Sequence, residues 1–267
     1  MTQPIHVPTH ADQQQPLLPS KVPEATIVFW IVKILATTVG ETGGDALSMT
    51  LQLGYAVATL VFLAFFVVTL TLQVRSDHYR PAIYWSVVVA TTTVGTTMSD
   101  FLDRTVGLGY VTSSALLLLA VLLILASWRA VAGRIEYQHI VRSRDEVFYW
   151  LTIVVSNTLG TALGDFAASS AGLGFERGAL AFAALLAIVA LAWRAARRIP
   201  ASVLFWAAYV LTRPLGATLG DTLTKPHAEG GFALARIPAS LTILAVLAAV
   251  LTVQVWCARG TRHASAN

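Results

Sequence analysis

Four segments of the chain repeat one sixteen-residue pattern without a gap, and this repeat limits the possible folds more than any other feature. In each segment a tryptophan stands ten residues before a glycine, and an aspartate stands five residues after that glycine. A second glycine, followed by an aromatic residue and an apolar run, comes nine or ten residues after the aspartate. This register indicates four copies of one supersecondary unit. The segments are Trp30–Asp45, Trp85–Asp100, Trp150–Asp165 and Trp206–Asp221.

The composition is that of a membrane protein. Of 267 residues, 56% are hydrophobic and only 12% are charged, whereas soluble domains carry about 25% charged residues. A transmembrane helix needs about 20 apolar residues, so each repeat has room for two. We therefore predict an all-α polytopic membrane protein with eight transmembrane helices, built as four tandem two-helix repeats with pseudo-symmetry. The expected spans are roughly 25–48, 55–74, 82–103, 110–128, 147–168, 178–196, 201–223 and 237–257, and the sixth is short unless it begins at Phe175.

The predicted domain organisation is one membrane domain between two tails. Residues 1–24 are polar, rich in proline and glutamine, and lack the basic and apolar regions of a signal peptide. We expect a disordered cytoplasmic tail at 1–24, a membrane domain at 25–257 and a second cytoplasmic tail at 258–267. The repeats within the domain are expected at 25–78, 79–140, 141–199 and 200–257.

The distribution of basic residues predicts the orientation. The tails and the loops between repeats hold twelve lysines and arginines, whereas the loops inside the repeats hold only Arg104, Arg177, Lys225 and Arg236. Because loops rich in lysine and arginine stay in the cytoplasm, we expect both termini there. The first helix of every repeat then crosses the membrane in the same direction.

A polar stripe runs along the first helix of each repeat and leads to the repeated aspartate. Residues three, four, seven and eight positions before each aspartate are mostly threonine or asparagine, and they share one helical face. We expect the four stripes to face inward and the second helices to face lipid. The alternative interpretation of the stripe is structural, because threonine hydroxyls in membrane helices often bond their own backbone. For the aspartates, the alternative is that each lies in solvent and caps the following loop.

Two repeats add charged residues to the stripe. Lys33 and Glu41 occur only in the first repeat and Arg213, with Pro214, only in the fourth. Intramembrane ionisable groups mark functional sites by default, and five acids against two bases favour a cation over an anion. The predicted ion-binding or path residues are Asp45, Asp100, Asp165, Asp221, Glu41, Thr38, Thr93, Thr158, Lys33 and Arg213.

Other repeated residues are expected to serve the architecture. Small residues four positions apart allow helix backbones to approach closely in lipid, and tryptophan is enriched at membrane interfaces. The predicted interface anchors are Trp30, Trp85, Trp150 and Trp206. The predicted helix-packing residues are Gly40, Gly44, Gly95, Gly160, Gly164, Gly216 and Gly220.

The sequence gives no basis for catalysis. A single cysteine, Cys257, leaves no intrachain disulfide, and no histidine pair has metal-ligand spacing on a helix. Phosphate-loop and hydrolase motifs are missing, and no histidine is placed to ligate a haem. We therefore expect no catalytic residues, no cofactor other than a cation bound as substrate, and no nucleic-acid partner.

The repeated pattern, an aromatic residue before tryptophan and then threonine or asparagine, glycine and aspartate, resembles a bacterial membrane-protein family known by a "repeat of unknown function". The resemblance covers residues 25–257 and departs in the fourth repeat, where Pro214 replaces threonine. It implies the architecture and a bacterial inner membrane but brings no activity.

The function that these residues favour is transport or channelling of a small cation. Carboxylate and hydroxyl oxygens suit Mg²⁺, Ca²⁺, Mn²⁺ or a proton, and a divalent ion such as Mn²⁺ is favoured, with the four aspartates as metal ligands. The alternative is a non-transporting membrane scaffold or partner-binding protein with a structural polar stripe. The expected partners are the lipid bilayer and the cation, and the oligomeric state is open.

Overall fold

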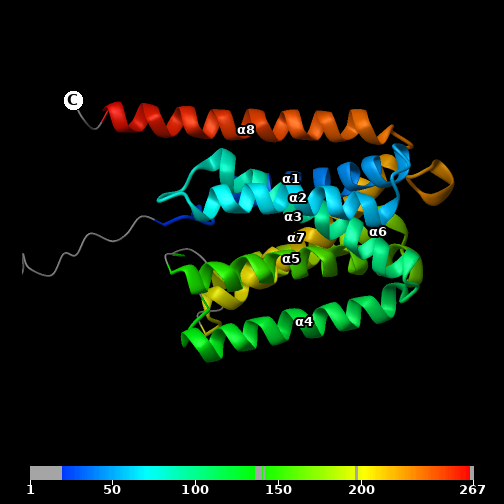
Figure 1. Cartoon of the computed structure of the whole chain (residues 1–267), viewed down its shortest axis with the longest axis horizontal. Helices are drawn as coiled ribbons and strands as arrows, with labels where there is room; N and C mark the ends of the chain where they lie inside the picture. The colour runs from blue at the N-terminus through cyan, green and yellow to red at the C-terminus, as the bar shows by residue number, and fades with distance from the viewer. Residues whose placement is uncertain (1–19, 136–139, 141, 196–197, 265–267) are drawn as a thin grey trace, which may run out of the picture.

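The computed structural model describes residues 20–135, 140, 142–195 and 198–264, and within them it forms eight α-helices (Figure 1). The predicted all-α fold is confirmed. The sixth helix begins earlier than the expected residue 178, and the eighth extends beyond 257. The helices are α1 Ile27–Asp45, α2 Gly54–Val74, α3 Pro81–Asp100, α4 Gly109–Ala132, α5 Ser143–Asp165, α6 Gly174–Ala195, α7 Ala201–Thr224 and α8 Arg236–Ala264.

The four odd-numbered helices form the centre of the bundle. Helix α1 packs against α3 and α7, and α5 packs against the same two helices, so the four form a closed ring. Each even-numbered helix packs against the odd helix of the next repeat: α2 against α3, α4 against α5 and α6 against α7. Helix α8 completes the cycle by packing against α1. Figure 1 shows α4 and α8 on opposite flanks of the central helices.

Six of the eight helical segments are long and apolar enough to cross a membrane by themselves, and α3 and α7 are not among them. Helix α3 is rich in threonine, and α7 contains the fully buried Arg213. Because both helices are surrounded by protein, their polar side chains need no contact with lipid. The exposed leucines, valines and isoleucines of the even helices give the bundle an apolar outer surface, which is compatible with lipid.

The glycine that precedes the repeated aromatic residue has a conformational role. Gly54, Gly109 and Gly174 each begin an even helix at φ +72°, in the left-handed region that glycine adopts at no steric cost. The fourth repeat departs from this pattern. Its short helix η5 (His227–Glu229) and its left-handed Gly230 bring Gly231 against the backbone of Lys225, where a Cβ would collide with the carbonyl group.

The repeated tryptophans lie at the end of the bundle where the odd helices begin, which we call the Trp end. Trp85, Trp150 and Trp206 are buried and pack with neighbouring tyrosines and phenylalanines in one aromatic cluster. The Tyr84 and Tyr149 hydroxyls are hydrogen-bonded at 2.7 Å inside it. An anchoring role at the lipid interface, predicted for all four tryptophans, is therefore open only to the partly exposed Trp30.

Candidate functional site

The repeat places equivalent residues of the four odd helices at the same level of the bundle. The residue three positions before the repeated glycine faces the glycine of the preceding repeat at every interface of the ring. A Cβ on any of these glycines would overlap its neighbour, so the helices meet at backbone contact distance. The pairs are Gly40 with Thr92, Gly95 with Asn157, Gly160 with Arg213, and Gly216 with Thr37, which closes the ring.

A second set of contacts lies one turn further along. Gly44 faces Thr96, Gly164 faces Ala217, and Gly220 faces Glu41. Hydroxyl groups also bridge the helices: Thr92 donates to the Ala36 carbonyl at 3.0 Å, and Thr96 donates to the Gly40 carbonyl at 3.2 Å. The seven predicted packing glycines thus all lie against a neighbouring odd helix. The backbone polar groups on these faces gain partners that lipid cannot provide.

Arg213 connects all four odd helices. Its side chain is fully buried, and its Nη2 group donates to Glu41 Oε2 on α1 at 3.0 Å. The same nitrogen lies 2.5 Å from Thr96 Oγ1 on α3 and 2.6 Å from Thr161 Oγ1 on α5. A charge in this position is tolerable only because Glu41 compensates it, since an unpaired buried charge is very costly.

Lys33 lies on the side of Arg213 toward the Trp end. Its ammonium is fully buried, 3.5 Å from Asn157 Oδ1 and 4.2 Å from the centre of the Tyr209 ring. Asn157 is held in place because its amide donates to Thr91 Oγ1 at 3.0 Å. Lys33 is therefore separated from the acidic residues, which lie at the other end of the odd helices.

The four repeated aspartates are buried inside the protein at that other end, which we call the Asp end. Asp45, Asp100 and Asp165 each stand immediately before a π-helical turn, Ala46–Thr50, Phe101–Thr105 or Phe166–Ser170. Such turns are rare and often mark functional sites. The alternative expectation that each aspartate lies in solvent is not met, because each side chain is almost completely enclosed.

Basic residues hold the aspartates in two ion-paired groups. Arg104 lies 3.1 Å from Asp100 and 3.7 Å from Asp165. Lys225 lies 3.2 Å from Asp221 and 3.5 Å from Asp45. Arg236 also contacts Asp45 at 3.5 Å, and Glu41 lies with Asp45 and Asp221 in a group whose oxygens are within 4.8 Å of one another.

These ion pairs correct the charge balance expected from the sequence. The sequence places Arg104, Lys225 and Arg236 in loops, yet all three contact the buried carboxylates. Together with Arg213 they give four cations for five carboxylates, a surplus of one negative charge at the Asp end instead of three along the stripe. Of the four predicted metal ligands, only Asp45 and Asp221 lie with Glu41 in the three-carboxylate group.

Lys225, which follows the end of α7, remains cationic in this position. Burial by itself lowers the pKa of its ammonium, but the carboxylates of Asp221 and Asp45 outweigh burial and raise the pKa above its usual value. Lys225 therefore behaves as a tethered cation between two carboxylates.

The aromatic residues that begin the even helices complete the Asp end. Tyr55 Oη accepts a hydrogen bond from Arg104 at 3.0 Å, and Tyr110 Oη accepts one at 3.3 Å. The Lys225 ammonium lies 5.8 Å from the centre of the Phe175 ring. The repeated aromatic signal was visible in the sequence, but its contact with the basic residues was not foreseen.

The predicted path threonines lie one position away from the central contacts. Thr38, Thr93 and Thr158 donate to carbonyls of their own helices. The residues just before them, Thr37, Thr92 and Asn157, form the contacts between helices, and Thr96 and Thr161 contact Arg213. The useful signal was the glycine spacing, because the residue three positions before each glycine is the one that meets the next helix.

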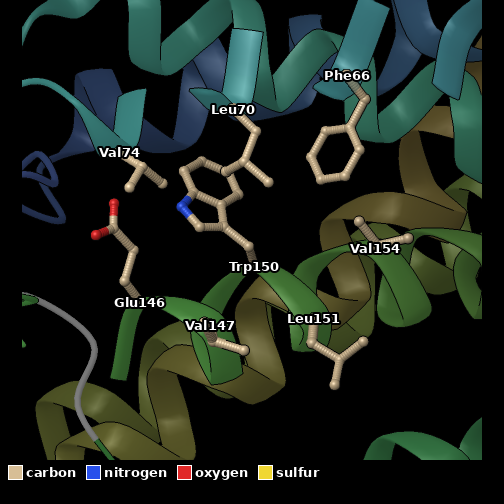
Figure 2. Close-up of a pocket in the computed structure, with 8 residues that line it drawn as sticks. All are labelled: Phe66, Leu70, Val74, Glu146, Val147, Trp150, Leu151 and Val154. Carbon is tan, nitrogen blue, oxygen red and sulfur yellow. The ribbon is translucent and has the colours of Figure 1, made fainter. Parts of the chain in front are cut away.

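Apolar grooves lie on the outer surface, away from the buried charge cluster. One runs between α2 and α5 and is lined by Phe66, Leu70, Trp150 and Val154, with Glu146 at one end (Figure 2). Equivalent grooves lie between α4 and α7, α6 and α1, and α8 and α3. They follow from the cyclic packing, because each even helix covers one odd helix and leaves a gap beside the next. The candidate site is therefore the buried charge cluster.

Comparison with known proteins finds four matches to one family, described as "Repeat of Unknown Function (DUF347)". The matched residues are 28–79, 83–133, 148–198 and 204–259. They take in most of the chain, and each contains one of the four repeats. No curated protein and no solved structure matches the chain significantly.

Proposed function

This chain belongs to the family built from the Repeat of Unknown Function (DUF347), and we propose that it transports a small cation. Its four copies of the repeat form one helical bundle of membrane-spanning character. The cation is a divalent metal such as Mn²⁺, or the transport is coupled to protons. The observation that carries the proposal is the burial of five carboxylates from the four central helices at the Asp end, three of which, Glu41, Asp45 and Asp221, have oxygens within 4.8 Å of one another. The protein acts without enzymatic chemistry.

The group of Glu41, Asp45 and Asp221 supports a specific binding mode. Its oxygens are close enough to share one ion, and hard oxygen ligands suit Mg²⁺, Ca²⁺ or Mn²⁺. Lys225 occupies the space between Asp45 and Asp221, so an arriving cation displaces its ammonium and takes over its charge. Arg236, on the partly exposed rim, is the second group that moves aside.

The proposed orientation places the Asp end outside the cell and both termini in the cytoplasm of a bacterium. It is supported by the excess of basic residues in the loops at the Trp end. The basic residues at the Asp end are the ones that pair with buried carboxylates. They therefore contribute little to the charge of the loops.

Flux measurements on proteoliposomes test the proposal. We expect the parent protein to carry Mn²⁺ or protons above the level of empty liposomes, and Asp45→Asn and Asp221→Asn to fall to that background. Lys225→Met should lower the cation concentration needed for half-maximal flux, because it removes the competing ammonium. Asp103→Asn is the matched control, since Asp103 accepts a hydrogen bond from Ser99 and lies outside the three-carboxylate group; it should retain parental flux.

A second function, that of a membrane scaffold, is favoured by the pairing of the carboxylates. Every aspartate of the cluster has a basic partner, and the threonines bond helix carbonyls. If the folded parent carries no tested cation or proton faster than empty liposomes, the transport proposal is rejected in favour of the scaffold function. If the parent transports a cation and the Asp45→Asn and Asp221→Asn variants have the same flux, then these aspartates do not bind the transported ion.

A further inference from the structure

Arg213 has hydrogen-bonding capacity that the described residues do not use. Its Nη2 group meets Glu41, Thr96 and Thr161, but Nε and Nη1 are buried and have no acceptor among the residues that the structure describes. A buried N–H group without a partner costs about 1–3 kcal/mol, and more when it is charged. In a native protein such groups usually contact an ordered water or an ion.

A second buried cation lies on the adjoining level of the bundle. The Lys33 ammonium has one long hydrogen bond, to Asn157, and no ion-paired carboxylate within the described part of the chain. Asn157 stands at the same repeat position as Arg213, and Tyr209, whose ring lies under the ammonium, precedes Arg213 by one helical turn on α7. The Tyr209 hydroxyl likewise lacks a described partner.

The chemistry of these groups selects the ligand. The protonated Lys33 and Arg213 side chains can only donate, and of the two charges only that of Arg213 is paired with a carboxylate, Glu41. A water molecule accepts two hydrogen bonds but needs acceptors for its own hydrogens, whereas an anion accepts from every side. Gly160 lies against the Cβ and Cγ atoms of Arg213, so the arginine stem is tightly packed, and a single-atom ion is the smallest anion that could bind beside it. We infer that the centre of the bundle binds a halide ion, such as chloride, between Lys33 and Arg213.

This site is separate from the proposed cation site. It lies between the aromatic cluster and Glu41, whereas Asp45 and Asp221 lie beyond Glu41 toward the Asp end. The inference therefore holds or fails independently of cation transport. A halide here balances the second buried cation and stabilises the folded state by mass action.

Thermal unfolding of the purified protein in detergent tests the halide site. Chloride at about 100 times its dissociation constant should raise the Tm of the parent by about 5 °C over gluconate at equal ionic strength. Lys33→Met should lose this difference. Lys21→Met is the matched control, because Lys21 pairs with Glu146 near the surface at the Trp end; it should keep the difference.

Crystals of the parent grown in bromide provide a measurement that depends on no variant. An anomalous peak between Lys33 and Arg213 is the expected result. Equal Tm values for the parent in the two salts, retention of the chloride effect in Lys33→Met, or a water in place of the bromide peak would overturn the inference.

Discussion

Replacing Arg213 with methionine is expected to lower the free energy of unfolding by about 3–5 kcal/mol. Arg213 is fully buried and is the ion-pair partner of Glu41, which is itself buried at 3% exposure. Methionine fills much of the same volume but removes the ion-pair partner of Glu41. Among the described residues, the Glu41 carboxylate then keeps the hydrogen bond from the Thr96 hydroxyl. The loss comes from the unpaired carboxylate, since removing both charges from a buried pair is often nearly neutral.

The double variant Arg213→Met/Glu41→Gln separates charge from packing. We expect it to recover most of the lost stability, so that a double-mutant cycle gives strong coupling between the two positions. Unfolding in detergent, followed by tryptophan fluorescence, measures all four corners of the cycle. Arg236→Met is the matched control: Arg236 is partly exposed and shares Asp45 with Lys225, so its removal should cost about 1 kcal/mol or less. Equal losses for Arg213→Met and Arg236→Met would refute the central role of Arg213.

The architecture follows from the repeat because each copy has the same contact surfaces, and each surface is buried only when it packs against another copy. Four equal units that each offer a glycine face and a complementary face can satisfy all of these faces by closing a ring. The contact of Gly216 with Thr37 closes it. The lengths of the apolar segments predict where the helices lie in the sequence, and the polar stripes predict which of these helices lie at the centre of the bundle. For this reason α3 and α7 were recognisable as helices although they are too polar to face lipid.

The ion pairs of the site could not be predicted in the same way. Arg104 follows Asp100 by four residues, where the sequence predicts a loop, because the π-helical turn that carries Arg104 has no sequence signature. Lys225 and Arg236 lie in or beside the irregular loop of the fourth repeat. The direction of such a loop depends on tertiary packing, here on the approach of Gly231 to the Lys225 carbonyl.

A geometric reason explains why Thr37, and not the predicted path residue Thr38, contacts the next helix. Helical periodicity places Thr37 and Thr38 on one broad face, since neighbouring residues differ by about 100° around the axis. Which of the two meets the next helix depends on where the backbones touch, and that is fixed by Gly40 and Gly216. The repeated glycines, as the points of closest approach, select Thr37 and Thr92 as the residues that contact the next helix.

The glycine contacts predict a second large effect: replacing a glycine with alanine should lower stability more, the closer the new Cβ lies to the neighbouring helix. In Gly216→Ala the new Cβ would overlap the Thr37 side chain and lie 2.9 Å from the Thr37 carbonyl carbon, so α1 and α7 have to separate. We expect a loss of about 3 kcal/mol. Gly164→Ala meets the Ala217 Cβ at 3.2 Å and should lose less.

Gly43→Ala is the internal control, because its nearest neighbour, the Thr93 Cγ2 methyl group, is 4.0 Å away. Alanine is the better helix former by about 1 kcal/mol, so this variant should be as stable as the parent or more stable. Unfolding in detergent ranks the three variants. The order Gly43→Ala, Gly164→Ala, Gly216→Ala from most to least stable is expected only if backbone contact closes the ring. Equal stability of the three variants would mean that side chains, and not backbone contacts at the glycines, set the distance between the odd helices.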